Sequence, residues 1–267
     1  MMERRPSGRR RGHLTARVVR IATSVGGIAT ILMVWEAVVA GFDVPLYILP
    51  APSVVATQIG RDWPLLLRHL EPTVVEALGG FAIGNGVATA LAAVFVYAPP
   101  ISRVMFPVAI ALRTIPLVAI TPLLVIWLGN GYAPKVAIAA LISFFPTLVN
   151  MARGFAAATP DQLELMHALA ASPWQVFRYV RWPASLPYLF SALRIASTSS
   201  VLGAIVAEWI GSDRGLGYLI VAATFEYRVA RLWATITVST ATAVLAFLVV
   251  VAAERSVVTW QQRSGPS

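Results

Sequence analysis

Six stretches of mainly apolar residues alternate with short polar or proline-containing segments along this 267-residue chain. A helix needs about 20 apolar residues to cross a bilayer. The stretches that approach or exceed this length are 21–42, 73–98, 104–128, 134–152, 187–210 and 232–253. We therefore expect an all-α, polytopic membrane protein with six transmembrane helices. Composition agrees, because 58% of the residues are hydrophobic and only 12% are charged, whereas soluble domains carry roughly 25% charged residues.

Basic residues predict the orientation of these spans. Residues 1–20 form an arginine-rich arm that could bind nucleic acid, but its position before an apolar stretch is typical of a cytoplasmic flank. The first stretch is too long for the core of a signal peptide, and no clear small-residue cleavage site follows it. With both termini in the cytoplasm, most arginines outside the spans fall on the cytoplasmic side. We expect an arm 1–20, a transmembrane domain 21–255 and a cytoplasmic tail 256–267.

Some spans carry polar or helix-breaking residues. Gly80 and Gly84, near Asn85 in the second span, allow either close helix packing or the lining of a pathway. The third span contains Arg113, Pro116 and Pro122, and the prolines predict a kink. The fifth span has Arg194, which could also reach the cytoplasmic interface. The candidates for lining a pathway are Asn85, Arg113, Arg194, Ser197, Thr198, Ser199 and Ser200.

The remaining acidic residues of the spans lie near the expected outer ends. Glu36, Glu76 and Glu208 are therefore predicted to sit on a solvated rim. Two outer segments connect the spans there. Residues 43–72 contain prolines that forbid one continuous helix, and residues 211–231 are expected to form a re-entrant or interfacial segment.

The cytoplasmic loop 153–186 has strong helix punctuation. Thr159 followed by Pro160 and Gln162 predicts a capped helix over about 160–170. Ser172 and Pro173 open a second helix, which should end near Trp182 because Pro183 disfavours helix before it. The two helices meet at the small residues 170–172.

The second helix is amphipathic and, at this length, too short to cross a membrane. Trp174, Val176, Phe177 and Val180 share an apolar arc that can pack on the membrane domain. The opposite side carries Gln175, Arg178, Tyr179 and Trp182. Aromatic residues and arginine are enriched in protein interfaces, so this side predicts a docking surface for another protein. The alternative is a helix that lies on the lipid interface.

No energy-coupling or catalytic motif accompanies this surface. The single lysine, Lys135, is not part of a phosphate-binding loop, and His13, His69 and His167 are scattered. We expect no catalytic residue and no metal site. A pathway and a docking surface without an energy source fit a transport subunit driven by a separate partner.

The loop resembles the cytoplasmic signature of the inner-membrane permease subunits of bacterial ABC importers, E-A-A, three residues, G, nine residues, then I-x-L-P. Glu164 and Pro183 match, and the spacing is kept. Leu165 and Met166 replace the alanines, Ala170 the glycine, Val180 the isoleucine and Trp182 the leucine. "LPAPSVV", "IPLVAITPLLVIWLGNG", "LPYLFSALRIAS" and "AEWIGSDRGLGYLI" are similar to segments of the nitrate/sulfonate/taurine branch, which includes pyrimidine-precursor and riboflavin permeases.

This resemblance implies a homodimeric permease in the bacterial inner membrane, with its pathway at the subunit interface. It implies two cytoplasmic ATPase subunits and an extracytoplasmic substrate-binding protein as partners, surrounding lipid, and no nucleic acid. The chain would bind no cofactor, because ATP would be used by the partner subunit. The residues implied in docking the ATPase are Glu164, Leu165, Ala170, Ser172, Pro173, Trp174, Arg178, Val180 and Pro183.

Two other classes of membrane protein would leave different signals in the sequence. A membrane-embedded enzyme would need carboxylates or histidines clustered near one membrane face, and the sequence suggests none. A secondary transporter or a channel, not coupled to an ATPase, would predict inverted repeats and intramembrane Asp or Glu. The ionisable groups expected near mid-span are instead Arg113 and Arg194.

Overall fold

The computed structural model describes residues 9–259, and within that range every regular element is helical. Four helices are long and apolar enough to cross a membrane, namely Trp63–Tyr97, Tyr132–Ala156, Pro173–Glu208 and Val229–Val257. A fifth candidate span is the pair α4 (Pro99–Arg113) and α5 (Leu117–Leu128), which is bent by 99°. The protein is thus a polytopic helical membrane protein, as the sequence predicts.

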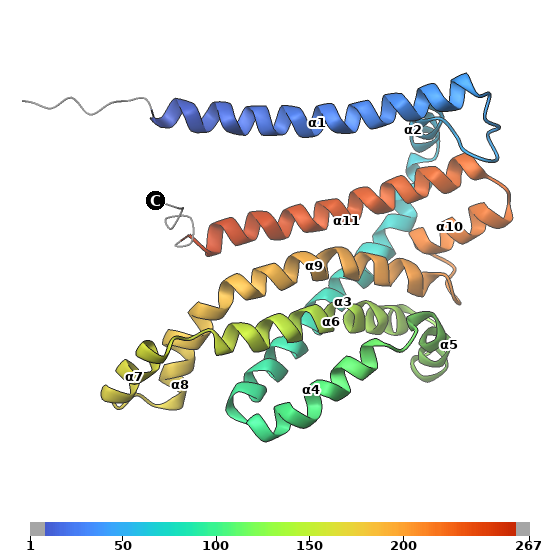
Figure 1. Ribbon diagram of the computed structural model, residues 1–267. Helices are drawn as coiled ribbons and strands as arrows, with labels where there is room; N and C mark the ends of the chain where they lie inside the picture. The colour runs from blue at the N-terminus through green and yellow to red at the C-terminus, as the bar shows by residue number, and fades with distance from the viewer. Residues whose placement is uncertain (1–8, 260–267) are drawn as a thin grey trace, which may run out of the picture.

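Three helices form the centre of the molecule (Figure 1). The helix α6 (Tyr132–Ala156) packs against both α3 (Trp63–Tyr97) and α9 (Trp182–Glu208). A side chain at Gly80 or Gly84 would overlap Ala139 or Ala140 of α6, and one at Gly203 of α9 would press on Ala139 from the other side. These glycines therefore serve close packing, the first of the two readings of the sequence.

The other helices surround this centre. The helix α11 (Val229–Val257) packs on α9 and, at its start, on α2 (Pro52–Arg61) and the short α10 (Leu216–Phe225). The helix α1 (Arg9–Gly41) lies outermost and meets α2. Figure 1 shows the start of α1 and the end of α11 at the same end of the molecule as α7 (Pro160–Ala168), which we name the α7 end. The opposite end, with α5 and α10, is named the α10 end.

Several predicted boundaries are wrong. The second span begins at residue 63 rather than 73. Within the expected outer segment 43–72, α2 and the first ten residues of α3 occupy 52–61 and 63–72, so no single helix runs through it, as the prolines predict. Prolines permit this since they stand in the first turns of α2 and α3, where no backbone donor is lost. The stretch 104–128 is two helices rather than one, broken at Thr114–Pro116. The kink expected in this span is thereby confirmed. Of the arm 1–20 and the tail 256–267, residues 1–8 and 260–267 lie outside the described range.

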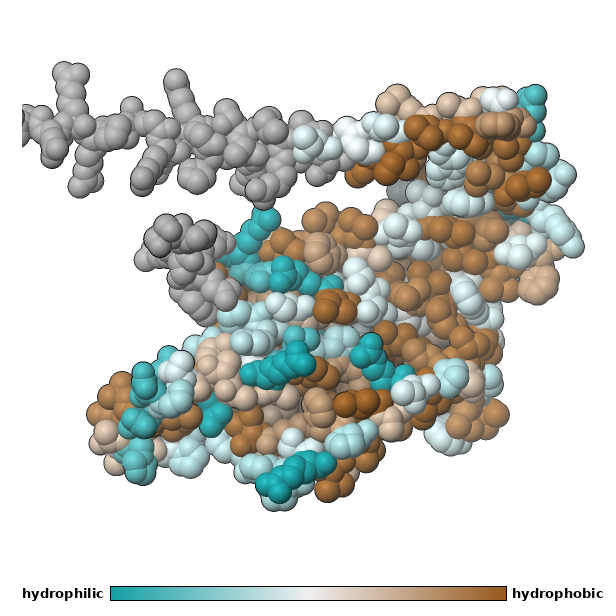
Figure 2. Space-filling model, in the orientation of Figure 1, coloured by the Kyte–Doolittle hydropathy of each residue, from teal (hydrophilic) through white to brown (hydrophobic). Residues whose placement is uncertain are grey.

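Much of the surface of the molecule is apolar. Apolar side chains cover most of the face shown in Figure 2, whereas at the α7 end hydrophilic and apolar side chains are interspersed. Many large apolar residues on α1, α4, α5 and α11 are exposed, including Ile31, Trp127 and Leu245. In water such a surface would be strongly unfavourable, so the hydrocarbon of a bilayer is the environment that this chain requires.

Candidate functional site

Two helix starts meet in a sharp corner at the α7 end. Thr159 and Gln162 form a capping box at the start of α7, and Ser172 and Gln175 form a second one at the start of α8 (Pro173–Val176). The sequence predicted the start of both helices. Between them Ala170 has a φ of 50°, a left-handed conformation that an alanine adopts only at a cost. The packing of the corner thus imposes on Ala170 a geometry that glycine adopts without strain.

The helix after the corner does not end near Trp182, contrary to the prediction. The helix α8 passes through the π-helical turn η1 (Phe177–Arg181) into α9, and the whole segment Pro173–Glu208 is continuous. In this turn the Trp182 N–H donates to the carbonyl of Phe177, five residues back. The wider turn accommodates Pro183, which has no N–H and whose ring would clash with the preceding turn of a regular α-helix.

Apolar and polar side chains of the corner point outward together. Leu165, Leu169, Trp174 and Tyr179 are each at least 60% exposed, and Glu164 and Arg178 are exposed between them. We name these six residues the corner surface. The predicted arc is only partly right: Trp174 is exposed, although it stacks on Phe177 at a centroid distance of 5.7 Å. Val176, Phe177 and Val180 are half-buried, as expected for the packing side.

An aromatic cluster attaches the corner to the central helices. Phe177 and Trp182 contact Phe155 near the end of α6, with centroid distances of 5.3 and 6.2 Å from Phe155. Trp182 was expected on the outward side and is instead part of this cluster. Tyr97, at the end of α3, donates its hydroxyl to the carbonyl of Pro173 at 3.1 Å. Arg181 donates to the carbonyl of Phe155 at 2.7 Å. The corner is therefore joined to α3, α6 and α9.

The polar residues predicted to line a pathway fall into three groups. Arg113 and Ser199 border one cavity of about 260 Å³ between the α4–α5 break, α6 and α9. Arg194 and Thr198 border a second cavity beside Phe247, where Arg194 is 3.5 Å from the Glu254 carboxylate.

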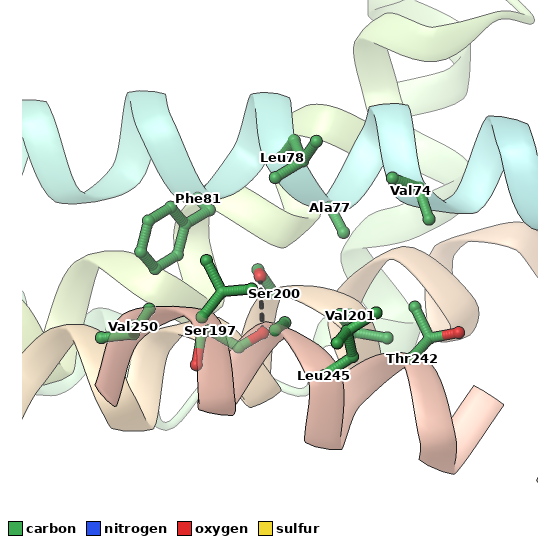
Figure 3. Close-up of a pocket in the computed structure, with 12 residues that line it drawn as sticks. Val74, Ala77, Leu78, Phe81, Ser197, Ser200, Val201, Thr242, Leu245 and Val250 are labelled. Carbon is green, nitrogen blue, oxygen red and sulfur yellow. Dashed lines mark hydrogen bonds between the residues drawn. The ribbon is translucent and has the colours of Figure 1, made fainter. Parts of the chain in front are cut away.

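The third group faces the opposite side of α9 or the interior. Ser197 and Ser200 lie on an apolar cavity of about 310 Å³ between α3, α9 and α11 (Figure 3). Their hydroxyls donate to backbone carbonyls of their own helix. Asn85 is buried between α3 and α6, where it accepts a hydrogen bond from Thr147. Of the seven predicted residues, Arg113, Arg194, Thr198 and Ser199 thus border two cavities that lie on the same side of α9, since Ile195 borders both. The other three do not border these cavities.

Comparison with known proteins identifies the architecture. Residues 80–263 match the family model described as "Binding-protein-dependent transport system inner membrane component". The chain belongs to this family. A probable ABC transporter permease protein of Haemophilus influenzae is 34% identical over 209 residues, covering 78% of this chain and 85% of that protein.

Two further relatives carry transport names. The riboflavin transport system permease of Chloroflexus aurantiacus is 34% identical, covering 71% of this chain and 72% of its own. The taurine transport system permease of Escherichia coli K12 is 26% identical, covering 76% and 77%. The chain is thus an ABC importer permease of the sulfonate/taurine-like branch, as the resemblance predicted.

The permease also contains a buried polar cluster at the α10 end that sequence reasoning missed. Glu76 and Glu208 were predicted on a solvated rim, yet each is 1% exposed. Lys135 is 7% exposed, and its Nζ is 3.5 Å from Glu76 Oε1 and 2.8 Å from the hydroxyl of Ser212. We name His69, Thr73, Glu76, Lys135 and Glu208 the α10 cluster.

This cluster binds the start of α10. The three amides at the N-terminus of that helix donate to His69 Nδ1 at 3.2 Å, to the Thr73 hydroxyl at 2.8 Å and to Glu208 Oε2 at 2.6 Å. Burial of such unpaired helix-terminal amides would otherwise be costly. The signal in the sequence is "GLG": a side chain at Gly215 or Gly217 would overlap Glu208. The glycines thus mark where a carboxylate approaches backbone.

Proposed function

We propose that this chain is the membrane-spanning permease subunit of an ATP-driven importer, with the α7 end in the cytoplasm. The observation that carries the proposal is the corner surface, an exposed group of apolar, aromatic and charged residues where α7 meets α8. In this proposal α1 and the α4–α5 pair complete six spans, both termini are cytoplasmic, and the membrane is the bacterial inner membrane. The ATPase subunit docks on the corner surface and uses the ATP, so the permease needs no cofactor of its own.

Continuity of the helix supports a direct route for the mechanical coupling. Because α8 continues through η1 into α9, a push on Trp174 or Tyr179 displaces the end of a single 36-residue helix. Phe155 and Arg181 pass the same displacement to α6. The corner would therefore move α6 and α9 together, and these two helices border the cavity that holds Arg113 and Ser199.

That cavity is the proposed part of the translocation pathway, completed by a second copy of the permease. The exposed apolar faces of α4 and α5 beside it are available for the second copy. The solute is a small molecule delivered by an extracytoplasmic binding protein: a sulfonate, taurine, nitrate or similar anion, or a pyrimidine or vitamin precursor. Arg113 favours an anion, and the taurine relative is consistent with that, whereas the riboflavin relative keeps the second class open.

The test is co-purification of the permease with its ATPase. Trp174→Asp and Tyr179→Asp place a charge on the corner surface, where both side chains are exposed. Trp174 stacks on the half-buried Phe177. We expect both to release the ATPase while the permease stays in the membrane. Phe225→Asp is the matched control, because Phe225 is 79% exposed at the α10 end. Retention of the ATPase by both corner variants would reject the proposal.

A secondary transporter is the competing function, and the buried carboxylates Glu76 and Glu208 are the observation that favours it. They do not border the cavity of Arg113, however, and both are engaged within the α10 cluster. Uptake by reconstituted vesicles separates the two functions. An importer requires ATP on the cytoplasmic side and takes up solute without an ion gradient, whereas a secondary transporter does the reverse.

A further inference from the structure

The charges of the α10 cluster do not balance if every group is in its usual state. Two carboxylates, Glu76 and Glu208, face one ammonium group, that of Lys135. His69 accepts a hydrogen bond from the Gly215 amide at Nδ1, so its imidazole is neutral. An uncompensated charge in so buried a place costs several kcal/mol. A proton on one of the two carboxyl groups would bring the cluster to neutrality.

Hydrogen-bond directions indicate which carboxyl group carries it. Glu208 accepts at both oxygens, from the Thr73 hydroxyl at 2.6 Å and from the Gly217 amide at 2.6 Å. It also lies at the N-terminus of α10, where a negative charge is favoured. These donors stabilise the ionised form of Glu208.

Glu76 has the opposite surroundings. Its Oε1 faces Lys135, while its buried Oε2 has no donor among the described residues. Its carboxyl group is a close neighbour of that of Glu208. Two ionised carboxylates can only accept, so a hydrogen bond between these neighbours requires a hydrogen on one of them, and Oε2 of Glu76 is the oxygen without another partner.

We propose that Glu76 is a neutral carboxylic acid that donates its proton to ionised Glu208, and that this proton-bearing pair positions α10. Glu76 thus acts through Glu208: the proton keeps Glu208 in place beneath the Gly217 amide. Loss of the proton would set two negative charges side by side, push Glu208 from the start of α10 and loosen the segment 211–228. The pair is a positioning device sensitive to protonation.

Other titratable and charged groups face this pair from each element packed around it. In the cavity that Glu76 borders, α6 contributes Tyr132 and Lys135, and the segment after α9 contributes Asp213 and Arg214. In the adjoining cavity α3 contributes Arg68, His69 and Glu71, and α10 contributes Tyr218. Asp213 and Arg214 pair with each other at 3.7 Å and are largely exposed. Tyr218 stacks on His69. None of these supplies the missing donor to Glu76 Oε2.

The infrared spectrum of the solubilised permease tests the protonation directly. A protonated carboxyl group absorbs at a higher frequency than a carboxylate, and the band shifts in D₂O. We expect the band of a buried carboxylic acid in the wild type and its loss in Glu76→Gln. Glu71→Gln, a change on the same helix, is the control that should keep the band. A spectrum unchanged by Glu76→Gln would overturn the proposal.

Hydrogen exchange of the amides at the start of α10 tests the positioning. In Glu76→Gln the amide N–H₂ can replace the carboxylic proton as donor, so protection should stay as in the wild type. Glu208→Gln should raise the exchange rates of residues 215–217 about tenfold or more. The side-chain NH₂ of the glutamine would face either the Thr73 hydroxyl or the Gly217 amide, both of which donate to Glu208 in the wild type. Equal loss of protection in both variants would show that Glu76 acts as an anion and would reject the proposal.

The pH dependence of this protection from hydrogen exchange is a third test. As pH rises, wild-type protection should decline relative to Glu76→Gln measured at the same pH, so that intrinsic chemical exchange cancels. A constant ratio over the alkaline range would contradict the proposal. All three measurements use the permease alone, so they stand whether or not the ATPase docks on the corner surface. If they succeed and ATPase docking fails, only the proposed importer function is rejected.

Discussion

Arg181 caps the end of α6 by donating from Nη1 to the carbonyl oxygen of Phe155 at 2.7 Å. Phe155 is the penultimate residue of that helix, and its carbonyl is one of the four that no helical amide can reach. A cation at a helix C-terminus is also favoured by the helix dipole. One side chain of η1 thus satisfies α6 and fixes the corner against it.

Arg181→Met should therefore separate assembly from coupling. The variant keeps much of the apolar stem but leaves the Phe155 carbonyl without its charged donor, a loss of about 1.5–3 kcal/mol. We expect the ATPase to remain bound while its stimulation by the loaded binding protein falls severalfold. Arg255→Met, an exposed change on α11, is the matched control. Full stimulation in Arg181→Met would mean that the contact with Phe155 carries no displacement.

Ala170→Gly should stiffen the corner. The alanine holds a φ of 50°, which costs an L-residue about 1 kcal/mol or more that glycine does not incur. Part of this gain is offset by the larger backbone freedom of glycine when the corner opens. Hydrogen exchange of the segment 159–176 measures the result, and we expect slower exchange in the variant. Ala171→Gly changes a neighbour without positive φ and should speed exchange instead. Slower exchange in both variants would show that relief of the left-handed conformation at Ala170 is not the cause.

The corner shows why local signals could be read from the sequence and the continuation could not. A capping box is complete within four residues, so Thr159–Gln162 and Ser172–Gln175 could be recognised from the local sequence alone. Whether the helix continues past Pro183 depends on whether one of its turns can widen into a π-helical turn. The contacts of Phe177 and Trp182 with Phe155 stabilise that wider turn, and they come from a helix more than 20 residues earlier.

The α10 cluster was unpredictable for a related reason. Glu76, Lys135 and Glu208 belong to three different helices, and each alone looks like a polar residue near the end of a span. What hides them from water is α10, a segment whose path depends on two glycines. Close backbone approach at Gly215 and Gly217 could have suggested a buried partner, but not that the partner is Glu208. The fold class, the four long helices and the corner could be predicted from the order of apolar, polar and capping residues along the chain. The contacts between side chains that are distant in the sequence could not.

Gly215→Ala tests the path of α10. Gly215 has a φ of 106°, and an added side chain would overlap the Glu208 carboxylate. Strain of this kind costs about 1–3 kcal/mol, so we expect a lower thermal unfolding midpoint. Gly131→Ala at the same end of the molecule is the control, because nothing lies within 4 Å of the added atom and its φ is not positive. An unfolding midpoint that falls equally in both would contradict the close approach of Glu208.

The ion pair between Asp62 and Arg231 should make the permease less stable in acid. Its carboxylate, between α2 and α3, accepts from Arg231 Nε at 2.6 Å and Nη2 at 3.1 Å. The hydrogen bond from Arg231 lowers the pKa of Asp62 below its usual value. The pair therefore contributes its full stability above the unfolded-state pKa of about 3.9, and this contribution is lost as the pH falls through the lower folded-state pKa.

Asp62→Asn should consequently be less stable than the wild type near neutral pH, by about 1–2 kcal/mol for a charged hydrogen bond that is partly open to solvent. The difference should shrink as the pH is lowered toward 3. Thermal unfolding of the solubilised permease across this range measures it. Asp213→Asn is the matched control, because its pair with Arg214 is 3.7 Å long and exposed, and such pairs contribute little. A gap between Asp62→Asn and the wild type that stays constant with pH would show that Arg231 binds residue 62 by shape and not by charge.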